Sequence, residues 1–315
     1  MSPGATGCSR IRLALAILAV CTAACETDGT EIQDAVATGG LLLAPVQVGG
    51  VAGSYLVDTG TNLSLVSEET GARLRTAGSP SGRTLVGREA VPMAEVRSDG
   101  IRFGGSLLRY PEQLGVLDLG FLASHLDRPV DGILGWDILQ QYRLAIDRSA
   151  GRLIASRQLD AHSALRRLNA VAPAAVLALE IVGGRPTVRA STGDRPLRLL
   201  LDTGSDATTL FAGSWSRLGL PPPSGTTERR RWKVTGITTG HATTLHDLRL
   251  GSVALADLPV VIADEPRPAT SGWKGLDGII GMDLLTRFVV AIDGPGLALH
   301  LAERVSGGGD DSASP

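Results

Sequence analysis

The stretch Leu56-Val57-Asp58-Thr59-Gly60-Thr61 decides the fold of this chain, because nearly the same residues return later as Leu200-Leu201-Asp202-Thr203-Gly204-Ser205. The second copy lies 144 residues after the first. In both copies two apolar residues lead into a small polar turn that contains a glycine, a pattern typical of a β-strand that ends in a tight loop. One such turn is a weak signal, but its return after a similar strand indicates an internal duplication.

Three further blocks recur in the same order, at offsets of 146 or 147 residues. The pairs are Val130 to Leu139 with Leu276 to Leu285, Leu144 to Asp147 with Val290 to Asp293, and Ile101 to Gly104 with Leu248 to Gly251. A nearly constant offset predicts two copies of one unit, residues 41–155 and 173–303. Between them, residues 156–172 carry Leu159, Leu165 and Leu168 among charged residues, which favours a short helical linker.

The composition of the 315-residue chain suits two β-rich lobes. Hydrophobic residues make up 43% but aromatic residues only 3%, so the cores must consist mainly of aliphatic side chains. The 40 glycines and 17 prolines indicate many short strands joined by tight turns. We therefore predict an all-β fold with a few short helices, one after Asp137 and one after Asp283, each capped by that aspartate.

Residues 1–25 read as a secretory signal peptide, because a basic segment and an apolar run end in small residues. Thr22-Ala23-Ala24-Cys25 resembles the lipobox of bacterial lipoproteins, which implies a lipid anchor on Cys25 and a periplasm-facing protein of the cell envelope. Plain secretion after cleavage near Ala24 is the alternative. No cysteine follows Cys25, so the exported domain is expected to fold without disulfides. Residues 26–40 and 304–315 are predicted to be a flexible tether and a disordered tail.

Each repeated turn is accompanied, some 75 residues later, by two apolar residues and a glycine: Ile133-Leu134-Gly135 and Ile279-Ile280-Gly281. Together these motifs resemble the signature of the pepsin and retropepsin aspartic peptidases, and the resemblance covers nearly the whole body twice. It implies two homologous β-barrel lobes related by a pseudo-twofold axis, similar to two retropepsin-type units fused in one chain. It also implies that a monomer is complete, and that the apolar residues of both stretches are buried.

The resemblance implies that Asp58 and Asp202 form a catalytic pair that hydrolyses peptide bonds. Two carboxyls this close cannot both ionise, so they share one proton. The ionised aspartate acts as general base on a water molecule, and the protonated one donates to the carbonyl oxygen of the substrate. The substrate is then a peptide or a protein, and no metal or cofactor is expected.

The neighbours of the two aspartates have supporting roles. Gly60 and Gly204 allow the backbone to turn sharply and bring their N–H groups to the carboxylates. By resemblance, Thr59 and Thr203 interlock across the lobe interface. Thr61 and Ser205 are expected to donate hydroxyl hydrogen bonds to the adjacent carboxylates, which predicts an activity optimum on the acidic side of neutral.

Pepsin-like enzymes close over their substrate with a β-hairpin that carries a tyrosine in the first lobe. The corresponding span here, from Arg83 to Arg97 with Gly87 at its turn, has no tyrosine. In the second copy the stretch from Trp232 through Gly236 to Gly240 reads as a hairpin with an aromatic residue. We therefore assign Trp232, Gly236 and Gly87 to substrate binding. Packing of Trp232 against its own lobe is the alternative.

Several other functions are excluded or disfavoured. The net charge is −2, so nothing attracts nucleic acid, and the basic run from Arg229 to Lys233 fits a solvated strand edge. The five histidines show no zinc-ligand spacing. Two further repeated pairs, Asp131 with Asp277 and Asp137 with Asp283, flank the apolar motifs and are expected to be turn and cap residues. A catalytically silent binding protein of the cell envelope stays open as the alternative function.

Overall fold

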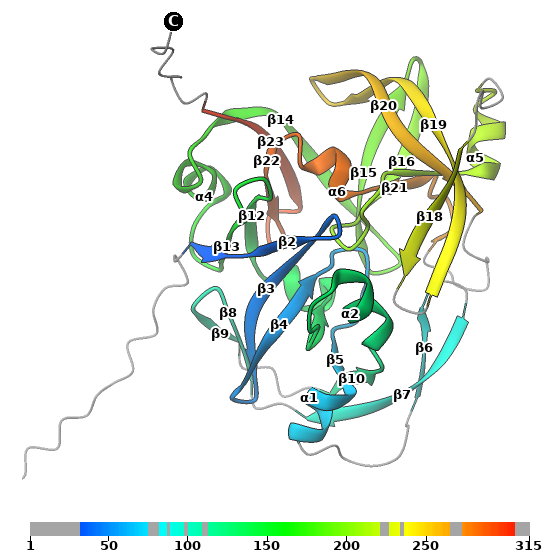
Figure 1. The fold of residues 1–315 in the computed structure, drawn as a ribbon. Helices are drawn as coiled ribbons and strands as arrows, with labels where there is room; N and C mark the ends of the chain where they lie inside the picture. The colour runs from blue at the N-terminus through cyan, green and yellow to red at the C-terminus, as the bar shows by residue number, and fades with distance from the viewer. Residues whose placement is uncertain are drawn as a thin grey trace, which may run out of the picture.

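The computed structural model describes residues 32–74, 82–86, 89–97, 100–108, 113–220, 227–233, 236–264 and 273–305. Within these residues the chain forms 23 strands and six short helices, and the strands make two large sheets (Figure 1). The prediction of a mainly β fold with a few short helices is confirmed.

The first copy forms a ten-stranded sheet in the order β6-β7-β10-β5-β11-β4-β3-β8-β9, with β2 paired to β3. Its strands are β2 (Val36–Thr38), β3 (Leu41–Val48), β4 (Val51–Val57), β5 (Leu65–Ser67), β6 (Gly82–Val86), β7 (Glu89–Arg97), β8 (Ile101–Phe103), β9 (Ser106–Leu108), β10 (Gln113–Leu117) and β11 (Gly132–Leu134). Strand β11 runs parallel to β4 and antiparallel to β5.

The second copy belongs to a thirteen-stranded sheet, in the order β1-β13-β12-β22-β23-β14-β15-β16-β21-β17-β20-β19-β18. Its strands are β1 (Gln33–Asp34), β12 (Arg143–Asp147), β13 (Arg152–Ser156), β14 (Ala170–Val182), β15 (Arg185–Thr192), β16 (Arg195–Leu201), β17 (Thr209–Phe211), β18 (Thr227–Lys233), β19 (Gly236–Leu250), β20 (Val253–Ala263), β21 (Gly278–Ile280), β22 (Val289–Asp293) and β23 (Ala298–Arg304). Strand β21 is parallel to β16 and antiparallel to β17, as β11 is to β4 and β5 in the first copy.

The two copies meet in the larger sheet, where β12 of the first pairs with β22 of the second. In this antiparallel ladder Ala145 lies opposite Ala291, its own counterpart in the repeat. Two equivalent strands that pair about equivalent residues are related by a twofold rotation through that point. The pseudo-twofold axis therefore passes between Ala145 and Ala291, and both alanines are fully buried.

The helices are short and complete the lobes. They are α1 (Glu68–Arg73), α2 (Gly120–Leu126), α3 (Trp136–Leu139), α4 (Ala161–Arg167), α5 (Ala212–Arg217) and α6 (Met282–Leu285). The expected helices near Asp137 and Asp283 are present, but each begins two residues earlier than predicted, at Trp136 and Met282, with a glycine at the N-cap position. The capping prediction is therefore wrong in detail, because the two carboxylates lie inside the first turn. None of the helices in the described part of the chain is long and apolar enough to span a membrane.

The ends of the predicted segments differ from the structure. Within the predicted tether, β1 pairs with β13 and β2 pairs with β3, so residues 33–38 belong to the folded body. The linker does contain a helix, α4, which Asp160 caps by accepting from the Ser163 N–H at 2.8 Å. Leu165 and Leu168 of this segment are buried, in one apolar cluster with residues of β12 and β22. Strand β23 extends to Arg304, where the tail was expected to begin. Residues 1–25 lie outside the described residues.

Candidate active site

Each Asp-Thr-Gly loop is held by the apolar strand that the sequence pairs with it. The N–H of Asp58 donates to the carbonyl of Leu134 on β11, and the N–H of Asp202 donates to the carbonyl of Ile280 on β21, both at 3.0 Å. The predicted burial of Ile133, Leu134, Ile279 and Ile280 is confirmed, with at most 6% of any of them exposed. The two loops are thus supported by the same contact in both lobes.

A reciprocal set of four hydrogen bonds joins the two loops across the lobe interface. The N–H of Thr59 donates to Oγ1 of Thr203, and the N–H of Thr203 donates to Oγ1 of Thr59, both at 3.1 Å. Each hydroxyl in turn donates to the opposite strand end: Thr59 to the carbonyl of Leu201 at 2.7 Å, and Thr203 to that of Val57 at 2.6 Å. Both threonines are completely buried. Such a network fixes the register of one loop against the other.

The carboxyl groups of Asp58 and Asp202 meet in the centre of this arrangement and form a hydrogen bond with each other. On one side, Oδ1 of Asp58 accepts from the N–H of Gly60 at 2.8 Å and of Thr61 at 3.2 Å. On the other, Oδ1 of Asp202 accepts from the N–H of Gly204 at 2.9 Å. Burial, and next the negative charge of Asp202, raise the pKa of Asp58 well above its ordinary value, while the loop N–H groups oppose this rise.

Glycine is required at both turns because the loops approach so closely. A Cβ atom on Gly60 would lie far inside van der Waals contact with the carboxyl carbon of Asp202. A Cβ atom on Gly204 would overlap the carboxyl of Asp58 in the same way. The two glycines therefore allow the carboxyls of opposite lobes to reach each other.

The hydroxyl groups of Thr61 and Ser205 are oriented differently from the prediction. Oγ1 of Thr61 points to the carbonyl of Leu63 at 3.5 Å, and Oγ of Ser205 donates to the carbonyl of Ala207 at 3.0 Å. A hydroxyl has one hydrogen to donate, so these contacts close the turn after each motif. Thr61 reaches Asp58 through its main-chain N–H instead.

Comparison with known families identifies both copies. The model of the aspartyl protease family matches residues 44–138 and again residues 188–284, ranges that begin and end at equivalent positions of the repeat. The chain belongs to the aspartyl protease family. Its fold is similar to the crystal structure of an aspartic proteinase from Irpex lacteus, with a TM-score of 0.53 and 15% sequence identity, over 87% of this chain and 97% of that one. A comparison with curated proteins found no match.

The other repeated aspartates of this aspartyl protease-family chain hold the backbone of the lobes. Asp137 accepts from the N–H and the hydroxyl of Ser64 at 3.0 and 2.7 Å. Asp283 accepts from the N–H and the hydroxyl of Thr208 at 2.8 and 2.6 Å. Ser64 and Thr208 in turn accept from the glycines that follow the apolar strands. Asp137 and Asp283 therefore have a structural role, as expected, but they hold the loops before the helices and do not cap them.

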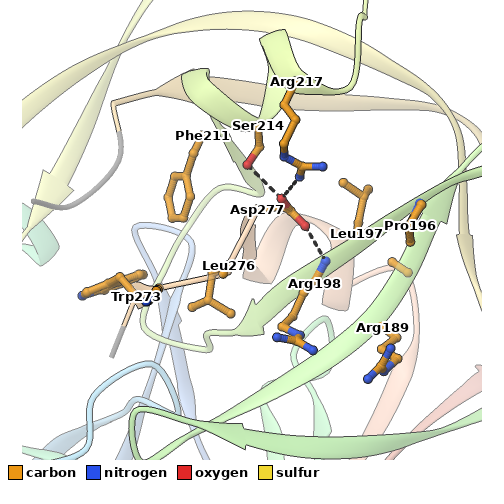
Figure 2. A pocket seen from close by; sticks show the side chains of 13 residues that line it. Arg189, Pro196, Leu197, Arg198, Phe211, Ser214, Arg217, Trp273, Leu276 and Asp277 are labelled. Carbon is orange, nitrogen blue, oxygen red and sulfur yellow. Dashed lines mark hydrogen bonds and ion pairs between the residues drawn. The ribbon is translucent and has the colours of Figure 1, made fainter. Parts of the chain in front are cut away.

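Asp131 and Asp277 have a second structural role, in tying a hairpin to a helix. Asp131 accepts from the N–H of Ser54 at 2.7 Å, and Asp277 accepts from the N–H of Arg198 at 2.8 Å. Asp277 also accepts from Oγ of Ser214 at 2.9 Å and pairs with Arg217 (Figure 2). All of these partners lie outside the Asp-Thr-Gly loops.

A pocket of about 820 Å³ opens in the second lobe beside Asp277, and neither Asp58 nor Asp202 lines it (Figure 2). Four basic and two aromatic side chains contribute to its wall. The residues that line it are Arg189, Ala190, Pro196, Leu197, Arg198, Phe211, Ser214, Arg217, Trp273, Lys274, Gly275, Leu276 and Asp277. One of these residues, Trp273, also stacks its ring against the guanidinium of Arg185.

Two of the three residues assigned to substrate binding, Trp232 and Gly236, lie on the hairpin of the second copy. Trp232 is on β18 and pairs with Ile237 of β19, and Gly236 begins β19 opposite Lys233. The predicted hairpin of the second copy is therefore present, and β18 contacts helix α2 of the first lobe. In the first copy β6 and β7 also form a hairpin, but Gly87 at its turn lies outside the described residues.

The sequence pattern did not single out Arg185, a basic side chain that contacts one of the dyad loops. It begins β15, is only 7% exposed, and donates from Nη1 to the carbonyl of Gly60 in the opposite lobe at 3.3 Å. Its guanidinium lies 4.1 Å from the centre of the Trp273 ring. The repeat itself held a signal, because the same offset that relates Asp58 to Asp202 places Leu41 opposite Arg185. A charged residue at a position that the first copy fills with leucine marks a difference between the lobes.

Proposed function

We propose that this chain is an aspartic endopeptidase, and that Asp58 and Asp202 are its catalytic residues. One observation carries the proposal: the two carboxyls come from equivalent positions of the repeat and form a hydrogen-bonded pair above four reciprocal threonine bonds. A merely structural pair of aspartates has no need of carboxyls that touch each other, since their mutual repulsion destabilises the fold. Membership of the aspartyl protease family supports the same conclusion.

The geometry suits hydrolysis by an activated water molecule. Because the pair raises the pKa of Asp58, one proton stays on the two carboxyls at a pH at which an isolated aspartate is ionised. The ionised member accepts a proton from water, while the protonated member donates to the carbonyl oxygen of the scissile bond. The N–H groups of Gly60, Thr61 and Gly204 hold the carboxylates in place during this exchange.

We propose that a single copy of the chain is active. Both aspartates, both threonines and both supporting strands belong to one polypeptide. No second subunit has to supply a missing half of the dyad. Size-exclusion chromatography of the active fraction tests this, since activity confined to a dimer contradicts it.

Cleavage of a proteome-derived peptide mixture between pH 3 and 8, with and without pepstatin, tests the proposed activity. We expect cleavage that pepstatin inhibits, and we expect Asp58→Asn or Asp202→Asn alone to abolish it while the protein stays folded. Asp194→Asn, at an exposed turn of the second lobe, is the matched control and should cleave normally. Peptides that bind but are not cleaved at any pH would support the silent binding protein instead.

We also propose that the protein is exported and carries a lipid on Cys25. The support is the order of basic, apolar and small residues before that cysteine. Mass spectrometry of the mature N-terminus, after expression in a bacterial host, tests this. A lipid-modified Cys25 that is lost in Cys25→Ala supports an anchored protein, whereas an unmodified N-terminus near Glu26 indicates plain secretion.

A further inference from the structure

Arg185 occupies a position that the duplication makes strictly comparable between the lobes. It follows the turn Gly183–Gly184, just as Leu41 follows the turn Gly39–Gly40, and all four glycines have positive φ. Both side chains are buried, Leu41 with 5% and Arg185 with 7% of the residue exposed. The backbone and the burial are thus the same in both lobes, and the charge is the difference.

The arginine is held against the first lobe by two contacts of different kinds. Its Nη1 donates to the carbonyl of Gly60 at 3.3 Å, so it touches the same loop whose N–H groups bind Asp58. Its guanidinium stacks 4.1 Å from the centre of the Trp273 ring. A planar guanidinium offers both interactions at once, which a lysine ammonium does not.

Burying a cation is unfavourable unless negative charge lies nearby. Burial lowers the pKa of Arg185, while the charges of Asp202 and then Asp58 raise it. An arginine is so basic that the group stays charged at every pH at which a protease works, despite this burial. Among the described residues, the negative groups that act on Arg185 are therefore the two members of the dyad.

Two titratable groups, His125 and Asp206, lie around the equivalent turn of the first copy, Gly39–Gly40. A side chain at Gly39 would meet His125, and one at Gly40 would meet Asp206, which itself acts on His125. The turn before Arg185 faces Asn62 instead, which carries no charge. The turn before Arg185 and its counterpart in the first copy therefore have different neighbours, an uncharged amide in one and an aspartate with a histidine in the other.

We propose that Arg185 is a positioning residue that stabilises the negative charge of the dyad, and so places the pH range of activity lower than the two carboxyls alone would. This inference rests on the proposed function, because it concerns the protonation of the same pair. A cation favours loss of a proton from a neighbouring acid. The form with one proton is the active form, so both the acidic and the alkaline limit of activity are at lower pH with Arg185 present.

The test is the pH profile of kcat/KM for wild type, Arg185→Leu, Arg185→Lys and Leu41→Met. Arg185→Leu installs the side chain that the first copy already accommodates in the same backbone. We expect both limits of its profile to move up by about 0.5–1 pH unit. Arg185→Lys keeps the charge and should stay within about 0.3 unit of wild type, even if kcat falls. Leu41→Met changes packing at the equivalent position of the first copy and should leave both pH limits unchanged.

Two results overturn the inference. One is an active Arg185→Leu whose limits do not move, and the other is an Arg185→Lys that shifts as far as Arg185→Leu. If Arg185→Leu does not fold, Arg185→Met replaces it as a longer neutral side chain. If wild type cleaves no peptide, the proposed function fails, but NMR titration of ¹³C-labelled aspartate carboxyls still decides the inference. The carboxyl titration of the dyad must then move to higher pH when Arg185 is replaced.

Discussion

Replacing Thr59 by valine removes two hydrogen bonds across the lobe interface and keeps the shape of the side chain. The lost bonds are the 2.7 Å bond to the carbonyl of Leu201 and the 3.1 Å bond from the N–H of Thr203. Each lost bond deprives a buried main-chain group of this partner, at a cost of about 1–3 kcal/mol. We therefore expect the free energy of unfolding to fall by roughly 2–6 kcal/mol, a large share of the ~5–15 kcal/mol of a typical domain.

Urea unfolding, followed by tryptophan fluorescence, measures this loss. Thr59→Ser is the matched control, since it keeps the hydroxyl and loses one methyl group, worth about 1 kcal/mol. Thr203→Val removes the other two bonds of the set and should destabilise the protein by a similar amount. The reasoning is refuted if Thr59→Val is as stable as Thr59→Ser, because the interlobe bonds would then contribute nothing to stability.

Two other predictions concern the dyad loops. Gly60→Ala places a methyl group into the carboxyl of Asp202 and must displace it by on the order of 1 Å, so we expect cleavage activity to fall at least ~100-fold. Gly50→Ala is the control, because Gly50 has a φ of +82° but a Cβ atom there would meet open space. This variant should lose stability and keep activity. Equal losses of activity in Gly60→Ala and Gly50→Ala would contradict the prediction. Asp58→Asn should raise the melting temperature by a few degrees at pH 7 and less at pH 3, because burial and Asp202 raise the pKa of Asp58 in the folded protein only. The fold therefore loses stability as the pH rises above the ordinary carboxyl pKa. If Asp58→Asn raises the melting temperature more at pH 3 than at pH 7, this prediction is wrong.

Much of the site could be read from the repeat because duplication converts sequence distance into symmetry. The offset of 144 residues alone made Asp58 and Asp202 equivalent, and Thr59 with Thr203 followed from the same comparison. The predicted burial of Ile133 and its counterparts followed from the same pattern, because apolar strands under a polar loop must be covered.

Other features escaped because they depend on strand pairing between distant segments or on the detailed geometry of a turn. Residues 33–38 were expected to be part of a tether, but they form strands because the edges of β3 and β13 offer unpaired backbone groups. The hydroxyls of Thr61 and Ser205 reach carbonyls two residues further on, a choice set by local turn geometry. Single-residue composition carries neither signal.

The sequence by itself determined the duplicated β-rich architecture and the two aspartates, because periodic apolar residues and repeated motifs encode strands and their symmetry. Only the tertiary structure showed that Arg185 of one lobe touches the Gly60 loop of the other, and that Trp273 covers it. The physical reason is that a buried charge is tolerated only where three dimensions bring a partner to it, and residues 60, 185 and 273 are far apart along the chain. The repeat thus encodes the symmetric part of the site. The fold then brings to it a charged side chain, Arg185, whose counterpart in the other copy is a leucine.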